Sequence, residues 1–409
     1  MNQDLLKKYA ALVIRVGVNL QHNQPLVIHA PIGCADFVHA LASEAYDVGA
    51  YDAVNWNDEE LSHIRFQKAA SERFKEFPAW RKDFYDDHAA RGAAFISIAA
   101  SDPDLYADID PKRLTEASQT AGKALMDYRA RLMSNKNTWC VVSVPTTAWA
   151  RKVFPHRSDD DAVQCLWAEM LHAVRVSEEE DAVSAWHAHI KRLQKITAFL
   201  NNRSFVELHY HSSLGTDLRI ELPKGHIWMG GAEKSAEGTL FAANLPTEEV
   251  YTLPKRNGVN GIVFASKPLH YNGNLIRDFM LRFHEGKVVE YKATHGENHL
   301  KELLGTDEGA SFLGEVALVP HDSPISQSGI LFYNTLFDEN ASCHLALGKA
   351  YPTCIENGES MTKEELCQHG VNHSLVHEDF MIGTPDLSVV GRTDSGEVVT
   401  IMENGNFTF

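Results

Sequence analysis

Acidic side chains and histidines gather in four short stretches of the C-terminal half, each set among apolar residues. The stretches are NLPTEEVYT (244–252), LGEVALVP (313–320), LFDENASCHLALGKAY (336–351) and SLVHEDFMIG (374–383). A carboxylate buried in apolar surroundings must be paired, hydrogen-bonded or bound to a metal, because burying it alone is very costly. A single strand glutamate can be explained by hydrogen bonds from the backbone. Four such stretches within one half of the chain favour a shared site.

Strand alternation selects which side chains of these stretches meet. In an extended segment the side chains of His377 and Asp379 lie on one face, and Glu378 lies on the other. Adjacent Glu248 and Glu249 likewise face opposite ways, so only one of them is expected to enter the site. Glu315 stands alone in an apolar strand, which makes it the strongest single candidate.

Metal ions are the expected partners of these carboxylates. The four stretches have no neighbouring cluster of arginines or lysines, so four inward carboxylates would need about two divalent cations for balance. Imidazole with carboxylate ligands suits Zn²⁺, Co²⁺ or Mn²⁺ better than Ca²⁺. The metalloprotease motif HExxH does not occur, and we interpret His295 and His299 of HGENH as ordinary surface or core residues. Neither a G-x-S-x-G nor a Walker A motif is present.

Composition narrows the class of protein. The 409 residues carry a net charge of −17, which argues against nucleic acid as a partner because acidic surfaces repel phosphate. No apolar run reaches the ~18 residues of a membrane span, and the first twenty residues do not resemble a secretory signal. None of the six cysteines forms a C-x-x-C pair. We therefore expect a cytoplasmic protein with reduced thiols and no membrane partner.

The surrounding elements divide the chain near residue 202. Apolar strands at 24–30, 51–56, 95–101 and 138–145 alternate with helices in the first half, which is typical of a sheet covered on both faces. Two helices close this half, and the second is expected to begin with the capping box Ser177-x-x-Glu180. Short alternating segments with Gly and Pro follow. The expectation is an α/β domain over 1–202 and a β-rich α+β catalytic domain over 203–409.

The four motifs, in this order, resemble the thermophilic-type metallo-aminopeptidases, the family of aminopeptidase T and aminopeptidase S. The resemblance extends over nearly the whole chain, from KYAALVIRVGVNLQHNQPLVIHAP (8–31) through GTDLRIELPKGHIWMGG (215–231) to N-x-S-x-x-H-x-D-F-M-I-G (372–383). It implies an N-terminal α/β domain, a C-terminal catalytic domain, a homodimer and release of N-terminal residues from peptides with a free N-terminus.

The resemblance also implies roles for individual residues. Matched motif by motif, the metal ligands are Glu249, Glu315, Glu339, His344, His377 and Asp379, where Glu339 is either a ligand or a near neighbour. Glu315 is the expected bridge between two divalent ions. Tyr351 would donate a hydrogen bond to the developing oxyanion, or alternatively orient a ligand. The expected reaction is attack by a metal-activated hydroxide on the scissile carbonyl.

Two other functions stay open at this point. Two histidines with carboxylates could hold a single Fe²⁺ in a ring-cleaving dioxygenase, a role seen in distant relatives of the resembled family. The number of carboxylates, enough for two ions, argues against that. The other alternative is a non-catalytic scaffold stabilised by metal, which would not need the tyrosine.

Overall fold

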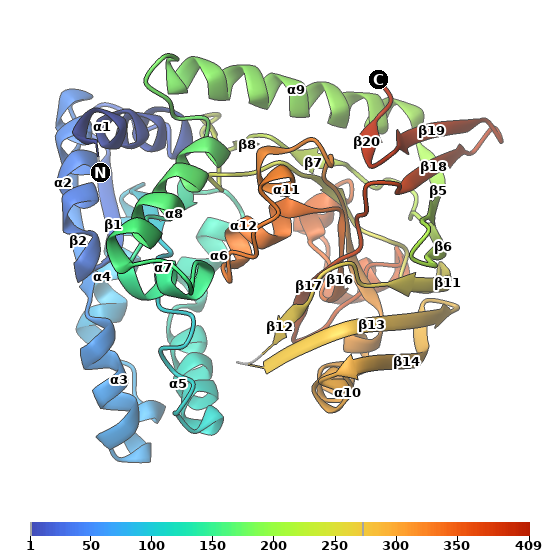
Figure 1. Cartoon of the computed structure of the whole chain (residues 1–409), viewed down its shortest axis with the longest axis horizontal. Helices are drawn as coiled ribbons and strands as arrows, with labels where there is room; N and C mark the ends of the chain where they lie inside the picture. Colours follow the sequence, from blue (N-terminus) through green and yellow to red (C-terminus); the bar gives the residue numbers. More distant parts are fainter. Residues whose placement is uncertain (1, 272–273) are drawn as a thin grey trace. The chain divides into compact units, whose positions relative to one another are not determined.

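The computed structural model describes residues 2–271 and 274–409, and these divide into two compact units (Figure 1). Unit 1 comprises Met1–Ile190, Ala232–Pro246 and Leu331–Leu336, and unit 2 comprises Lys191–Gly231, Thr247–Ile330 and Phe337–Phe409. The division falls inside helix α9 (Ala182–Arg203), and the boundary expected near 202 lies at the end of the same helix. Two short segments from beyond that boundary belong to unit 1.

Unit 1 is built on a parallel sheet with the strand order β2-β1-β3-β4. Its strands coincide with the apolar runs of the first half, and their bounds are Pro25–Pro31 (β1), Tyr51–Asn57 (β2), Ala94–Ile98 (β3) and Trp139–Val142 (β4). Parallel neighbours require crossover connections, and helices supply them here. The expected α/β fold of this part is confirmed.

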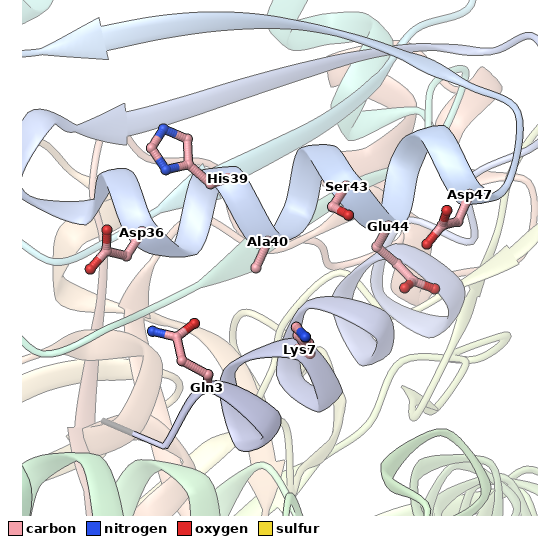
Figure 2. A pocket seen from close by; sticks show the side chains of 8 residues that line it. All are labelled: Gln3, Lys7, Asp36, His39, Ala40, Ser43, Glu44 and Asp47. Atoms are coloured by element: carbon pink, nitrogen blue, oxygen red, sulfur yellow. The ribbon is translucent and has the colours of Figure 1, made fainter.

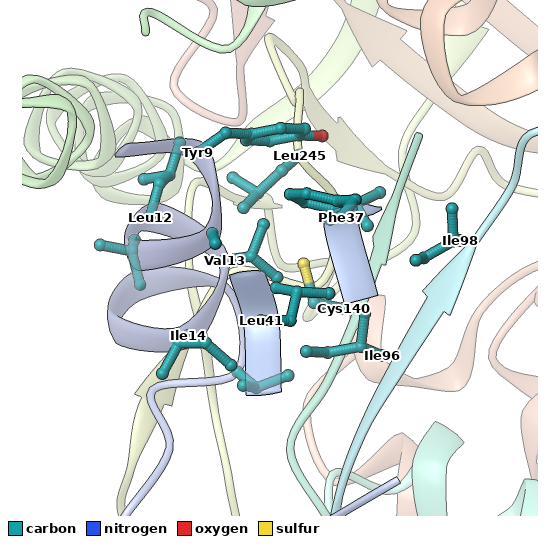
Figure 3. Close-up of a cluster of buried hydrophobic side chains, with 14 of the residues drawn as sticks. Tyr9, Leu12, Val13, Ile14, Phe37, Leu41, Ile96, Ile98, Cys140 and Leu245 are labelled. Carbon is teal, nitrogen blue, oxygen red and sulfur yellow. The ribbon is translucent and has the colours of Figure 1, made fainter. Parts of the chain in front are cut away.

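Helices connect and accompany these strands. They are α1 (Gln3–Leu12), α2 (Ala35–Asp47), α3 (Glu59–Lys68), α4 (Ala79–Ala90), α5 (Pro111–Ala124), α6 (Met126–Met133), α7 (Thr147–Val153) and α8 (Asp159–Ala173). A π-helical turn, Val13–Gly17, continues α1. Tyr9 of α1 stacks on Phe37 of α2 with ring centroids 4.8 Å apart, and Figure 3 shows both beside Ile96 of β3. This core joins the first two helices to the sheet.

The start of α9 differs from the expected capping box. Ser177 Oγ does accept a hydrogen bond from Glu180 N, but the helix begins only at Ala182. The carboxylate of Asp181 accepts from the Ser184 amide at 2.9 Å, so it caps the helix instead. An acidic residue at this position also interacts favourably with the helix dipole.

Unit 2 contains a long antiparallel sheet in the order β12-β13-β11-β6-β5-β18-β19-β20, with β14 paired to β13. The strands are β5 (Phe205–His211), β6 (Asp217–Glu221), β11 (Val259–Phe264), β12 (Leu269–Tyr271), β13 (Asn274–His284), β14 (Lys287–His295), β18 (Ser388–Thr393), β19 (Val398–Glu403) and β20 (Asn406–Phe407). Helix α10 (Glu297–Leu304) packs beside β13 and β14 (Figure 1). The β-rich character expected after 203 is confirmed.

A second sheet of unit 2 has the order β17-β16-β15-β10-β7 and carries the acidic stretches. Its strands are β7 (Met229–Gly230), β10 (Val250–Thr252), β15 (Leu313–Leu318), β16 (His344–Gly348) and β17 (His377–Met381). Val316, Leu345 and Phe380 pack into the hydrophobic core of the unit. Because side chains alternate, the neighbours of these residues project from the opposite face.

No helix among the described residues is both long and apolar enough to cross a membrane.

Candidate metal centre

Three neighbouring strands bring acidic residues into one row across the second sheet of unit 2. Ala346 of β16 pairs with Glu315 of β15 on one side and with Asp379 of β17 on the other. Directly paired residues of antiparallel strands project from the same face, so both carboxylates stand over the Ala346 methyl group. A small side chain at this central position leaves space between the two acids.

Both predicted histidines lie on the same face. His344 is two residues before Ala346, and His377 is two residues before Asp379, so alternation aligns all of them. His377 Nε2 lies 3.3 Å from Glu315 Oε2 and 3.5 Å from Asp379 Oδ1. His344 Nε2 lies 3.8 Å from Glu315 Oε1. The two rings thus approach the same carboxylate from opposite sides.

Glu249 completes this arrangement from the strand on the other side of β15. It directly precedes β10, and its Oε2 atom lies 3.2 Å from His344 Nε2. Donor atoms of Glu249, Glu315 and His344 come within 4.8 Å of one another, as do those of Glu315, His377 and Asp379. Each group of three has metal-ligand chemistry, and Glu315 belongs to both.

Backbone carbonyls determine the orientation of both imidazole rings. His344 Nδ1 lies 3.1 Å from the carbonyl of Ser342, and His377 Nδ1 lies 2.6 Å from the carbonyl of Lys349. A carbonyl only accepts hydrogen bonds, so each Nδ1 carries the proton and each neutral ring presents a lone pair at Nε2. Such a second contact is typical of histidines that bind metals through the other nitrogen.

Glu339 lies beside the cluster without belonging to either group of three. It begins a 3₁₀ turn, Glu339–Ala341, and its burial and the charges of Glu249 and Asp379 raise its pKa well above the usual value. Asn340 fixes this part of the site, because its side-chain amide donates to Glu339 Oε1 at 3.4 Å and its Oδ1 accepts from the Glu248 amide at 2.7 Å.

The electrostatics of the cluster call for added positive charge. Among the described residues, no lysine or arginine forms an ion pair with its carboxylates. Burial raises the pKa of Glu249, and burial opposes charging of His377, yet Asp379 and Glu315 raise the His377 pKa to about 11. Protons thus take up part of the negative charge here. Divalent cations would do so more completely, and the nitrogen and oxygen donors fit them.

Tyr351 lies next to the histidine of the edge strand. Its ring centroid is 4.7 Å from that of His377, and burial together with the charges of Glu315 and Asp379 raises its pKa above 10. The phenol is therefore protonated at neutral pH and can donate a hydrogen bond. The motif HGENH lies elsewhere, since His299 is paired with Glu302 on α10.

Sequence reasoning missed the groups that hold the ligands in place. Asn340 is hidden within the acidic motif FDEN, where its polarity attracts no attention, and the Ser342 and Lys349 carbonyls belong to the backbone. The signal that could have revealed Asn340 is a buried amide between two candidate ligands, and burial is a tertiary property.

A separate cavity of about 460 Å³ lies in unit 1 between α1 and α2 (Figure 2). Lys7, Asp36, His39 and Glu44 are among its lining residues, and the side chains of Asp36 and His39 are exposed. The described residues of this cavity share none of the clustered ligands of unit 2. It is therefore not part of the candidate metal centre.

Comparison with known proteins gives the context of this cluster. The family model described as thermophilic metalloprotease (M29) matches residues 2–407. The chain belongs to this metalloprotease family. As a member of the M29 metalloproteases it is a metal-dependent peptide hydrolase, which agrees with the donor set described above. The resemblance expected from the four motifs is confirmed.

Curated relatives match the chain nearly end to end. It is 49% identical to aminopeptidase 2 of Geobacillus stearothermophilus and 47% identical to aminopeptidase AmpS of Bacillus subtilis, each over 99% of this chain and 98% of the relative. Identity to aminopeptidase T of Thermus aquaticus is 40%, over 98% of both chains.

Solved structures agree with this M29 assignment. The structure of AmpT from Thermus thermophilus superposes with a TM-score of 0.94 at 38% identity and covers both chains completely. A 2,5-dihydroxypyridine dioxygenase from Pseudomonas putida superposes with a TM-score of 0.56 at 10% identity, over 100% of this chain and 98% of that one. The second similarity is one of fold alone.

Proposed function

We propose that this protein is an aminopeptidase that holds two divalent ions at the cluster on β10, β15, β16 and β17. The ligands are Glu249, Glu315, Glu339, His344, His377 and Asp379, with Zn²⁺, Co²⁺ or Mn²⁺ as the metal. The similarity to relatives named aminopeptidases supports the reaction. The substrates are peptides with a free N-terminus.

The observation that carries the proposal is the place of Glu315 in both groups of three donors. A carboxylate has two oxygens, and here Oε1 faces His344 while Oε2 faces His377. Such a residue can bridge two cations, each with its own histidine. A single Fe²⁺ site of the dioxygenase type needs only two histidines and one carboxylate. Glu249 and Asp379 exceed that requirement, so the two-metal hydrolase is favoured over the oxygenase.

Each residue has a defined task in this proposal. Bound divalent ions supply an activated water and polarise the scissile carbonyl. The Ser342 and Lys349 carbonyls keep both imidazoles in the ligating tautomer. The Tyr351 hydroxyl donates its proton to a hydrogen bond with the carbonyl oxygen as negative charge develops there. A Glu315 oxygen takes the proton of the attacking water and delivers it to the leaving amine.

Removal and return of metal test the proposal directly. Protein stripped with a chelator should release no amino acid from a peptide with a free N-terminus, and added Zn²⁺, Co²⁺ or Mn²⁺ should restore release. Metal analysis of the active protein should give two ions per chain. The same peptide with an acetylated N-terminus should not be cleaved. Full activity of metal-free protein, or equal cleavage of both peptides, would contradict the proposal.

The assembly and compartment belong to the same hypothesis. We propose a homodimer in the cytoplasm, as expected from the resemblance and from the absence of a signal-like N-terminal stretch. Sedimentation of the purified protein would measure the first.

A further inference from the structure

A cavity of about 190 Å³ lies within unit 2 at the end of the strands that carry the metal centre. Its lining includes Lys267, Val319, His321, Ser342, Gly383 and Leu387. An engineered protein cavity of about 150 Å³ accommodates benzene, so this volume suits a group the size of an amino-acid side chain or a short chain end. Most of the lining is apolar or small, which gives the one lysine special weight.

Lys267 is partly buried, and among the described residues it forms no hydrogen bond or ion pair. Burial lowers its pKa, and the charge of Asp338 acts in the opposite direction. The lysine is held at the cavity because the neighbouring Ser266 amide donates to the Met381 carbonyl at 2.8 Å. Buried ammonium groups normally have an anionic partner. The missing partner is therefore an anion that enters the cavity.

The cavity adjoins the metal centre through the chain itself. Its wall includes Ala341, Ser342 and Cys343, the residues that join Glu339 to His344. Ser342 also provides the carbonyl that orients the His344 ring. The spacing of two strand residues is about 7 Å, which is also about two residues of an extended peptide. A substrate held at the metal centre can thus reach the cavity.

We propose that this cavity is a subsite for a carboxylate of the peptide substrate, with the Lys267 ammonium as its charge partner. The inference rests on the proposed aminopeptidase function and specifies its substrate class. The carboxylate has two possible sources, the C-terminus of a short peptide or an acidic side chain near the N-terminus. Both present the same chemistry to the lysine.

Matched peptides separate these sources. The first pair is Leu-Gly-Gly with a free or an amidated C-terminus. The second is Leu-Glu-Gly amide against Leu-Gln-Gly amide, and the third is Glu-Gly-Gly amide against Gln-Gly-Gly amide. The wild-type protein should prefer the charged member of at least one pair. Lys267→Met should reduce that preference, measured as the ratio of kcat/KM values, by about tenfold to a hundredfold, mainly through KM.

Two further variants make the result specific. Lys267→Arg keeps the positive charge and should retain much of the preference. Lys301→Met removes an exposed lysine from α10 and should keep the wild-type ratio. Equal use of both members of every pair by the wild type, or an unaltered preference in Lys267→Met, would overturn the subsite while peptide release continues. If the metal-loaded wild type releases no amino acid from any of the six peptides, the proposed function fails and the subsite with it.

Discussion

Single atoms of the metal centre have separable tasks, and Tyr351 offers the clearest separation at the scale of residues. The Tyr351 ring lies against His377, but the ring of that histidine is oriented by the Lys349 carbonyl and not by the tyrosine. Removal of the phenolic hydroxyl therefore leaves the ligand geometry intact. A hydroxyl that acts on the substrate can be distinguished from one that only supports a ligand.

We expect Tyr351→Phe to bind metal as the wild type does and to turn over roughly 10²- to 10³-fold more slowly, which is typical for loss of one oxyanion donor. The Michaelis constant should change little, because the hydrogen bond is strongest in the transition state. Metal analysis and steady-state kinetics check both points. Loss of metal from Tyr351→Phe would indicate instead that the hydroxyl supports the ligands.

Asn340 makes a different prediction at the same scale. Asn340→Asp keeps the oxygen that accepts from Glu248 N but replaces the donor to Glu339 with a second acceptor. Two facing acceptors repel, so Glu339 should be displaced and metal affinity should fall by about 10- to 100-fold, as for other residues that position ligands. A competitive chelator titration measures this. Asn404→Asp makes the same change at an exposed turn and should have wild-type affinity.

At the scale of elements, the register of β15, β16 and β17 decides which acids meet. A shift by one residue would turn every side chain to the other face, so the hydrophobic face of the sheet fixes the ligand face as well. Val316, Leu345 and Phe380 are fully buried in the core, and this holds Glu315, His344 and Asp379 on the opposite side. The pattern of buried residues thus places the metal ligands.

Neighbouring residues of β17 test this register. Asp379→Asn should lose metal and activity, because it removes a ligand charge from the cluster. Glu378→Ala should bind metal and retain most activity, since Glu378 pairs with Leu347 and projects from the other face. Metal content and peptide release are measured for both variants. The reverse outcome, with metal lost only from Glu378→Ala, would require a different register for this strand.

At the scale of the whole molecule, the pH dependence of stability has a source far from the metal centre in sequence. Burial, with a further contribution from Arg81, lowers the pKa of His29 on β1 from 6.5 to about 4. Its Nδ1 lies 3.1 Å from the Asn55 amide nitrogen, which suits the neutral ring. Between pH 6.5 and 4 the unfolded chain binds this proton and the folded chain does not. Stability is therefore lost as the pH falls through this range.

The loss from His29 should be at most about 3 kcal/mol, the equivalent of the change in its pKa. In His29→Gln this contribution disappears. We therefore expect the free energy of unfolding of the wild type to fall more steeply between pH 6.5 and 4.5 than that of the variant, as measured by urea titration. Parallel slopes for the two proteins would show that His29 is charged in the folded state.

The sequence by itself determined the elements and the ligand candidates. Apolar runs such as 24–30 and 95–101 predicted the parallel strands of unit 1, because strands buried on both faces need continuous apolar residues. The H-x-D spacing predicted that His377 and Asp379 share a face, because alternation is local. Helix starts were less secure, as Asp181 shows, since several polar residues near an N-terminus compete to cap it.

Only the tertiary structure decided how distant strands combine. Register places Glu315 opposite Ala346 and Ala346 opposite Asp379, and no local pattern encodes the pairing of strands that are separated in sequence. The Asn340 contacts and the partnerless state of Lys267 likewise depend on burial. The assignment of 331–336 to unit 1 is equally a matter of packing. Local chemistry names the side chains, and long-range packing sets the distances between them.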